Sequence, residues 1–202
     1  MMSDDGSLVQ YGCGLCAPQG WLNFDASPTL RLQRLPLVGG LRRRLVGGPR
    51  FPGTVRFGDI LRGLPVASGS CRAVYCLHVL EHLALEDLRT ALAETRRLLG
   101  EGGVFRLVLP DLEALVAEYS AASDPRAAHR FRPRGFVGLL RNWLGNSRHL
   151  WMWDYGALAA ELAEAGFRDV RRAAFGDSSE PRFADVEDRG RWDGQLGIEC
   201  RR

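Results

Sequence analysis

The chain has 202 residues, of which 46% are hydrophobic, and this is enough for one well-buried globular domain but short for two. Its formal net charge is +3, and all 27 basic residues are arginine. So mild a charge gives little attraction for nucleic acid, and a nucleic-acid partner is not expected. No apolar run approaches the roughly 18 residues of a transmembrane helix, which excludes a spanning segment and leaves peripheral membrane contact open.

The cysteines indicate a reducing compartment. There are five of them, an odd number, behind an acidic and polar N-terminus that does not read as a secretory signal peptide. A cytoplasmic location is therefore expected. Cys13 and Cys16 form a C-x-x-C pair, but no second pair or histidine at zinc-finger spacing accompanies them. We interpret them as small apolar residues that line a turn, not as metal ligands or a redox pair.

Two short strands are predicted near the start of the chain. Residues 7–14 (SLVQYGCG) end in a Gly-x-Gly turn, and residues 21–25 (WLNFD) end at Asp25. Only six residues separate Gly14 from Trp21, which leaves no room for the helix that follows a dinucleotide-binding loop. The first helix of the fold is therefore expected to be shortened or absent.

The next segment, residues 27–53, is rich in Pro, Gly and Arg. It predicts an irregular connection, with a short helix near residues 41–46. Strands at 54–59 and 71–78 follow and are joined by a loop. The second of these strands is mostly apolar, as expected for a parallel strand that is buried on both faces.

An amphipathic helix is predicted over residues 85–99, because apolar residues recur at i, i+3 and i+4 and Gly100 follows as a stop signal. The rest of the chain predicts a strand at 103–111, a second amphipathic helix from residue 112, an irregular segment at 123–150, a helix capped at Asp154 and ended at Gly166, and strands at 168–175 and 194–202.

Strands that alternate with helices predict an α/β fold with an open, mainly parallel sheet. Ligands of such sheets bind beyond the carboxyl ends of the strands. An acid after the second strand can accept hydrogen bonds from ribose hydroxyls, and one after the third can accept from an adenine amino group. The candidates at strand ends are Gly12 to Gly14, Asp25, Asp59, Cys76 to His82 and Leu109 to Asp111.

The motifs YGCG, GWLNFD, FGDILRGLP, HVLEHL and LLGEGGVFRLVLPDL closely resemble those of class I S-adenosylmethionine-dependent methyltransferases. More closely, they are similar to a bacterial branch of small, type 11-like methyltransferase-domain proteins. The resemblance runs over about residues 8–120. It implies a Rossmann-like, mainly parallel sheet of about seven strands, with helices on both faces and an antiparallel strand near the C-terminus. It also implies S-adenosylmethionine as the cofactor.

The resemblance further implies a role for each matching position. One departure from the family pattern is Cys16, which stands where a third loop glycine is expected, and another is GEGG in place of a Pro-Gly-Gly turn. By position, Gly12, Cys13 and Gly14 would pass under the methionine portion of the cofactor, Asp25 would bind the ribose, Asp59 and Ile60 would lie on the adenine side, and Leu77 and His78 would lie beside the methyl group.

Methyl transfer from a sulfonium mainly requires alignment of the acceptor and exclusion of water. If the acceptor is a hydroxyl, His78 is the predicted catalytic base, because a neutral imidazole can take a proton near pH 7. The alternative is that His78 and His82 are structural. Glu81, His82 and His149 could also join His78 in a metal cluster like that of small-RNA 2′-O-methyltransferases. Since many relatives with this Glu-His pair hold no metal, no metal is predicted.

The acceptor is expected to be a small molecule, a glycan or a lipid-linked compound, methylated on oxygen or nitrogen. Residues 120–153 combine arginine with aromatic side chains, which suits a cap over such an acceptor. Three other functions are alternatives: a non-catalytic binding or scaffold module with a methyltransferase fold, a metal-assisted RNA 2′-O-methyltransferase, and a nicotinamide dehydrogenase. The dehydrogenase is disfavoured, because G-x-G-x-x-G opening a helix is missing and the acid comes too early.

Overall fold

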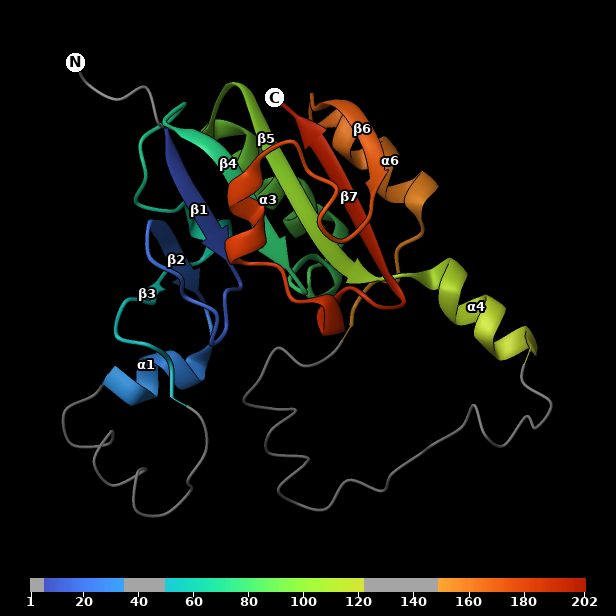
Figure 1. The fold of residues 1–202 in the computed structure, drawn as a ribbon, viewed down its shortest axis with the longest axis horizontal. Helices are drawn as coiled ribbons and strands as arrows, with labels where there is room; N and C mark the ends of the chain where they lie inside the picture. Colours follow the sequence, from blue (N-terminus) through green and yellow to red (C-terminus); the bar gives the residue numbers. More distant parts are fainter. Residues whose placement is uncertain (1–5, 35–49, 122–148) are drawn as a thin grey trace, which may run out of the picture.

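The strands of the described residues form one sheet in the order β3-β2-β1-β4-β5-β7-β6 (Figure 1). The computed structural model describes residues 6–34, 50–121 and 149–202. From β3 to β5 all neighbours are parallel, and β7 runs antiparallel to both β5 and β6. The predicted Rossmann-like sheet, with its antiparallel strand near the C-terminus, is confirmed. The strands are β1 (Ser7–Tyr11), β2 (Trp21–Asp25), β3 (Arg56–Phe57), β4 (Cys71–Leu77), β5 (Leu99–Pro110), β6 (Arg168–Ala173) and β7 (Gln195–Arg201).

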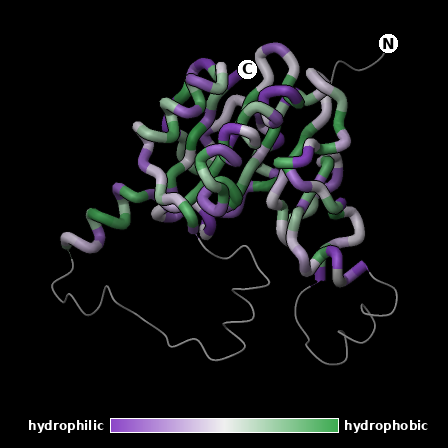
Figure 2. The backbone as a smooth tube through the Cα atoms, turned by 180° about the vertical axis from the view of Figure 1, so that it is seen from behind, coloured by the Kyte–Doolittle hydropathy of each residue, from purple (hydrophilic) through white to green (hydrophobic). Residues whose placement is uncertain are grey.

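Two different kinds of structure cover the two faces of the sheet. One face packs against helices α3 (Leu85–Leu98) and α6 (Tyr155–Glu164), whose buried leucines join the larger apolar cluster. The other face packs against the segment before β7, which holds the short 3-10 helices η3 (Pro181–Asp185) and η4 (Arg189–Arg191). The second face is toward the viewer in Figure 1 and the first in Figure 2.

Arg106 on β5 holds this second covering segment in place. Its side chain is fully buried, and its guanidinium binds the carboxylates of Glu187 at 2.5 Å, Glu199 at 2.9 Å and Asp177 at 3.0 Å. A buried cation is stable only with such partners. Because Asp177 and Glu187 flank η3, these bonds fix η3 against the sheet.

The connection from β1 to β2 contains no helix, as the spacing predicts. Helix α1 (Pro28–Arg34) follows β2. The sequence predicts an irregular connection there, and that prediction is wrong for these residues. The Oγ of Ser27 accepts a hydrogen bond from Thr29 N at 3.2 Å, and Pro occupies the first helical position, where its missing N–H costs nothing. Leu30 is buried beneath the helix. The short helix expected at residues 41–46 lies outside the described residues.

Two predicted helices differ in detail from the structure. Helix α3 ends at Leu98 because Leu99 already pairs with Cys71 of β4, so β5 begins four residues earlier than predicted. Helix α4 (Leu112–Ala121) forms where the second amphipathic helix is predicted, but none of its residues is buried. In Figure 1 α4 extends away from the sheet. None of the helices in the described ranges is both long enough and apolar enough to cross a lipid bilayer.

Candidate active site

A cavity of about 620 Å³ lies at the carboxyl ends of β1, β2 and β4. The strand order reverses between β1 and β4, so the cavity is at the point where open α/β sheets bind their ligands. A second cavity, of about 420 Å³, lies where β4 and β5 begin, at the opposite end of the sheet. The first cavity is lined by Tyr11, Gly12, Asp25, Ala26, Ser27, Pro28, Thr29, Gly58, Asp59, Ile60, Leu61, Leu77, His78, Val79, His82, Leu83 and Arg191.

The turn after β1 brings backbone directly to the cavity. Gly12 has φ of 70°, and a Cβ added there would overlap Cγ2 of Val79, so only glycine fits this position. Cys13, in contrast, is buried against Leu30 and Val55 and does not line the cavity. The cavity lining also excludes Gly14, whose N–H is used to hold Asp25. Of the predicted loop residues Gly12, Cys13 and Gly14, Gly12 alone therefore lines the cavity.

Asp25 is the acid at the end of β2, and it is only 8% exposed. Its Oδ2 accepts a hydrogen bond from Gly14 N at 2.9 Å, and its Oδ1 accepts one from Ser27 N at 2.7 Å. Each carboxylate oxygen has two lone pairs, so both oxygens keep capacity for another donor. The carboxylate is therefore fixed in place and can still accept bonds from two vicinal hydroxyls, as the ribose of S-adenosylmethionine would require.

Asp59 and Ile60 meet at the start of the 3-10 helix η1 (Ile60–Arg62), which lies within the predicted loop. Oδ1 of Asp59 accepts a hydrogen bond from Leu61 N at 3.1 Å and so caps η1. Ile60 is buried and contributes an apolar wall. This part of the cavity offers one carboxylate and apolar surface, a combination that suits an adenine ring with its amino group.

His78 follows directly after β4 and continues the sheet, because its N–H donates to Val108 O at 2.9 Å. Its φ is 52°, a left-handed conformation that residues other than glycine adopt only rarely. Leu77 is buried beside it, and both line the cavity. The backbone at this strand end is thus held in an unusual conformation that places an imidazole at the cavity wall.

Glu81 binds the His78 imidazole and is a partner to which the sequence prediction assigns no such role. It lies on the 3-10 helix η2 (Leu80–His82) and is only 1% exposed, with Oε1 3.1 Å from Nδ1 of His78. A carboxylate can only accept here, so Nδ1 carries the proton and Nε2 of the neutral ring is the basic nitrogen. The pair has the geometry of a base held in orientation by an acid.

Two lining residues are missing from the sequence prediction. Ser27 caps α1, and the Ser-Pro pair at the start of that helix could have indicated it. Arg191 comes from η4 and reaches the cavity through tertiary packing, for which the sequence carries no signal. Asp111, a predicted strand-end candidate, is elsewhere: Oδ1 accepts a hydrogen bond from Glu113 N at 2.9 Å, and Oδ2 is 3.3 Å from Arg172. Of the eight predicted cofactor or catalytic residues, six line the cavity: Gly12, Asp25, Asp59, Ile60, Leu77 and His78.

Solved structures of methyltransferases have a fold similar to that of this chain. A methyltransferase dependent on S-adenosylmethionine from Thermotoga maritima aligns with a TM-score of 0.52, at 16% identity over 99% of this chain and 84% of the other. Another from Archaeoglobus fulgidus aligns with a TM-score of 0.52, at 15% identity over 98% and 87%. PigF with SAH aligns with a TM-score of 0.50, at 18% identity over 99% and 57%. The fold is that of class I methyltransferases.

The sequence agrees with this fold. Residues 10–107, just under half of the chain, match the family model described as "Methyltransferase domain". Together with the solved structures, this match indicates an S-adenosylmethionine-dependent methyltransferase. A 37.1 kDa protein in transposon TN4556 of Streptomyces fradiae is 34% identical over 128 residues, which are 61% of this chain. The match spans only 36% of that curated relative.

Proposed function

We propose that the chain transfers the methyl group of S-adenosylmethionine to a hydroxyl of a small molecule, a glycan or a lipid-linked compound, with His78 as the catalytic base. The observation that carries this proposal is the 3.1 Å hydrogen bond between Nδ1 of His78 and Oε1 of Glu81 at the wall of the cavity. An amine acceptor would need no base before transfer if it were already neutral, whereas a hydroxyl gains from one.

The remaining cavity residues support a specific placement of the cofactor. The two bound oxygens of Asp25 would accept the ribose hydroxyls, Asp59 and Ile60 would meet the adenine, and the turn at Gly12 would let the methionine portion approach the backbone. PigF with SAH, which shares the fold, supports a ligand of this kind. This orientation would bring the reacting end of the cofactor to the end of β4, where Leu77 and His78 lie.

The proposed reaction needs one proton transfer. When bound, S-adenosylmethionine would supply the methyl group, and its sulfonium sulfur would become a neutral thioether. Nε2 of His78 would accept the proton of the acceptor O–H as the acceptor oxygen bonds to the methyl carbon. Glu81 then stabilises the imidazolium, because its carboxylate holds the opposite nitrogen. The charge that leaves the sulfur thus ends on a histidine that is already paired with an acid.

The surroundings of the cavity support a sugar-like or anionic acceptor. Arg191 lines the cavity, and the indole of Trp151 is 44% exposed in a segment whose backbone is bonded to Glu81. A guanidinium suits an anionic group and an exposed indole suits the face of a sugar ring. We propose that residues 120–153 act as a substrate cap, although residues 122–148 lie outside the described residues.

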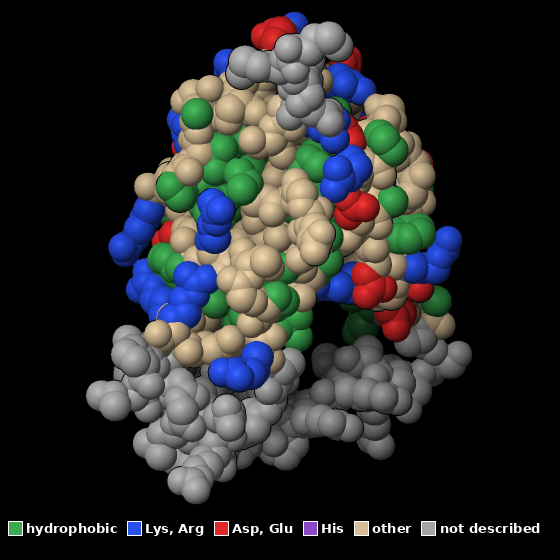
Figure 3. All heavy atoms as spheres, turned by 60° about the vertical axis from the view of Figure 1, so that its left-hand side comes forward, with side chains coloured by type: hydrophobic (Ala, Val, Ile, Leu, Met, Phe, Trp, Pro, Cys, Tyr) green, Lys and Arg blue, Asp and Glu red, His purple; other side chains and the backbone are tan. Residues whose placement is uncertain are grey.

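The charge distribution supports this acceptor class over nucleic acid. On the face in Figure 3, arginine side chains are spread in separate groups, some of them beside acidic side chains, and do not form one continuous basic surface. A nucleic-acid site would normally present a stripe or patch of one charge. A cytoplasmic location is also part of the proposal, and the five free cysteines support a reducing compartment.

The test is methyl transfer from radiolabelled S-adenosylmethionine to a panel of sugar, phenol and amine acceptors. His78→Gln should lower kcat by about 10²- to 10⁴-fold and leave the calorimetric affinity for S-adenosylmethionine within a few fold. Glu86→Gln, on the exposed start of α3, is the matched surface control. A His78→Gln variant with full turnover would overturn the assignment of the base. Binding of neither S-adenosylmethionine nor S-adenosylhomocysteine would favour a scaffold role instead.

A further inference from the structure

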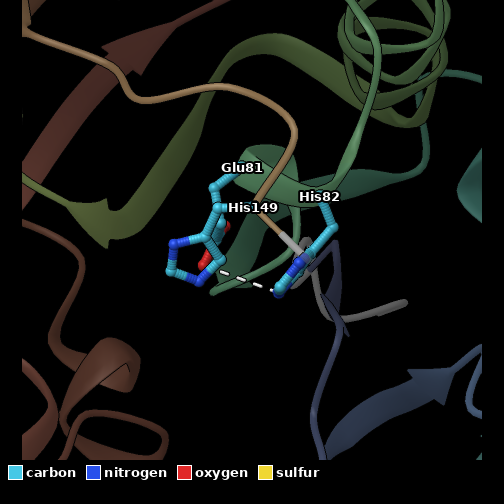
Figure 4. A group of neighbouring side chains, drawn as sticks. All are labelled: Glu81, His82 and His149. Carbon is cyan, nitrogen blue, oxygen red and sulfur yellow. Dashed lines mark ion pairs between the residues drawn. The ribbon is translucent and has the colours of Figure 1, made fainter. Parts of the chain in front are cut away.

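Three possible metal ligands gather beside the cavity, at the end of β4. The ligand atoms of Glu81, His82 and His149 all lie within 4.8 Å of one another. Nε2 of His82 is 3.9 Å from Oε1 of Glu81, and the rings of His82 and His149 meet edge to face with centroids 5.1 Å apart. In Figure 4 the three side chains gather at one place, and the dashed line joins the Glu81 carboxylate to the His82 imidazole. Two imidazoles and one carboxylate are the ligand set of many catalytic zinc and non-haem iron sites.

A second observation at the same place points to a cation. Oε2 of Glu81 is buried and has no hydrogen-bond partner among the described residues, although Oε1 is bonded to His78. The whole side chain is almost completely buried, since its exposure is 1%. A buried carboxylate oxygen without a donor or cation is destabilising and rare in folded proteins. One oxygen of Glu81 is thus used by the proposed base, and the other is left for a different partner.

The backbone builds the cluster from two distant segments of the chain. The carbonyl oxygen of Glu81 accepts hydrogen bonds from Leu150 N at 2.8 Å and Trp151 N at 3.2 Å. These two bonds bring the adjacent His149 to the end of β4. Glu81 and His82 are consecutive on the turn η2, so all three side chains depend on one backbone junction. His149 is exposed, which leaves the cluster open to solvent on one side.

We propose that Glu81, His82 and His149 bind a divalent transition-metal ion of the zinc, manganese or iron class. Three protein ligands leave at least one coordination position for an outside oxygen. His82 lines the cavity as well, so this position would be next to the cofactor site. The assignment of this coordination position rests on the proposed function: it would be occupied by the acceptor hydroxyl. Metal binding would make the hydroxyl proton easier to remove, and Nε2 of His78 would accept it.

The direct test measures metal binding alone, without methyl donor or acceptor. Metal-free full-length protein is titrated with Co²⁺, whose visible absorption reports its ligands, and Zn²⁺ is then added as competitor. One Co²⁺ per chain is expected to bind, and Zn²⁺ to displace it. His149→Ala, at an exposed position, and Glu81→Gln, which keeps the side-chain volume, should each weaken binding at least about tenfold. Glu86→Gln should leave the affinity unchanged, and circular dichroism confirms folding of each variant.

Three outcomes would overturn parts of the proposal. The absence of stoichiometric Co²⁺ or Zn²⁺ binding would overturn the site itself. Unchanged affinity in both His149→Ala and His82→Ala would overturn the ligand assignment. If chelation and subsequent addition of Zn²⁺ or Mn²⁺ leave methyl transfer unaltered, the metal has no part in the reaction. Because Co²⁺ binding is read without the cofactor, a failure here is distinguishable from a failure of the methyltransferase proposal.

Discussion

Two buried carboxylates, Asp25 at the wall of the cavity and Glu81 behind His78, differ in how completely they are bonded. Both oxygens of Asp25 accept backbone hydrogen bonds, from Gly14 and Ser27. Glu81, in contrast, has one oxygen on His78 and one oxygen with no hydrogen-bond partner in the part of the chain that the structure describes. The first carboxylate is fixed by the fold itself, and the second has bonding capacity that the fold leaves unused.

We interpret this difference in bonding as a division between two tasks: Asp25 would bind the cofactor, and Glu81 would take part in proton transfer. A group that recognises a cofactor benefits from being held rigidly, because less freedom is lost on binding. A group that takes part in proton transfer must respond to a changing charge, and in the proposed reaction Glu81 would do so through His78. The β1–β2 half therefore resembles a preformed cofactor site, and the β4 half contains the groups that can move protons or bind an ion.

Of the substitutions that compare these two carboxylates, Asp25→Ala should have the strongest effect, a loss of cofactor binding. Removing the carboxylate takes away the acceptors for both ribose hydroxyls and releases the N–H groups of Gly14 and Ser27. Charge-assisted hydrogen bonds contribute about 1.5–3 kcal/mol each, so affinity should fall by about 100-fold or more in calorimetry. Asp111→Asn, at a buried acid outside the cavity, is the control. Similar affinities in the two variants would refute the role of Asp25.

A smaller and different effect is expected from Glu81→Gln in the other half. The amide keeps the side-chain volume but removes the charge that stabilises the His78 imidazolium. Turnover should fall by about 10- to 100-fold, whereas the affinity for S-adenosylmethionine stays within a few fold. Steady-state kinetics combined with calorimetry separates the two readouts. If cofactor affinity falls as much as turnover does, the proposed division of tasks between the two halves is wrong.

Gly12 and Gly14, the two glycines of the turn after β1, should differ in how much an alanine substitution lowers the free energy of unfolding. Both have positive φ, but a Cβ at Gly14 meets nothing within 4 Å, whereas at Gly12 it overlaps Val79. Gly14→Ala should cost about 1–2 kcal/mol of unfolding free energy through the left-handed backbone alone. Gly12→Ala should cost about 1–3 kcal/mol more, because the overlap has to be relieved as well. Urea denaturation of both variants measures the difference, and equal losses would contradict the close approach at Gly12.

The smallest effect concerns the thiol behind the cofactor half. Burial, and then the negative charge of Asp25, raises the pKa of Cys13 to about 12. At pH 8 the folded protein should therefore hold Cys13 as a neutral thiol, since the ordinary thiol pKa lies near 8.5 and only the thiolate reacts. Alkylation followed by peptide mass spectrometry should label Cys13 only after unfolding, later than the less buried Cys16. Early labelling of Cys13 would show that this half opens readily.

The cofactor half can be predicted from the sequence because its signals are local. A glycine turn and an acid that ends a strand put Gly12 and Asp25 at the carboxyl ends of parallel strands, and both line the cavity there. Helix α1 is harder to predict because the segment around it is rich in Pro, Gly and Arg, although Ser27 followed by Pro28 is a helix-start signal. The helix is stabilised by the burial of Leu30, a tertiary effect that local composition does not show.

The β4 half is less predictable, for a physical reason. The place of His78 after a strand identifies it, but its left-handed φ and its bond to Glu81 follow from the turn η2, which no periodicity indicates. The position of His149 depends on bonds from Leu150 and Trp151 to the Glu81 carbonyl. Such long-range backbone bonds are decided when the chain packs, and a single sequence contains no pattern for them.

A crystal structure of the protein with S-adenosylhomocysteine would show directly whether the cavity is divided in this way. If the cavity is divided into a cofactor half and a reacting half, the ribose hydroxyls donate to both oxygens of Asp25, the adenine lies at Asp59 and Ile60, and the sulfur lies beside Leu77 and His78. A ligand bound elsewhere, or one whose ribose makes no contact with Asp25, would contradict this division.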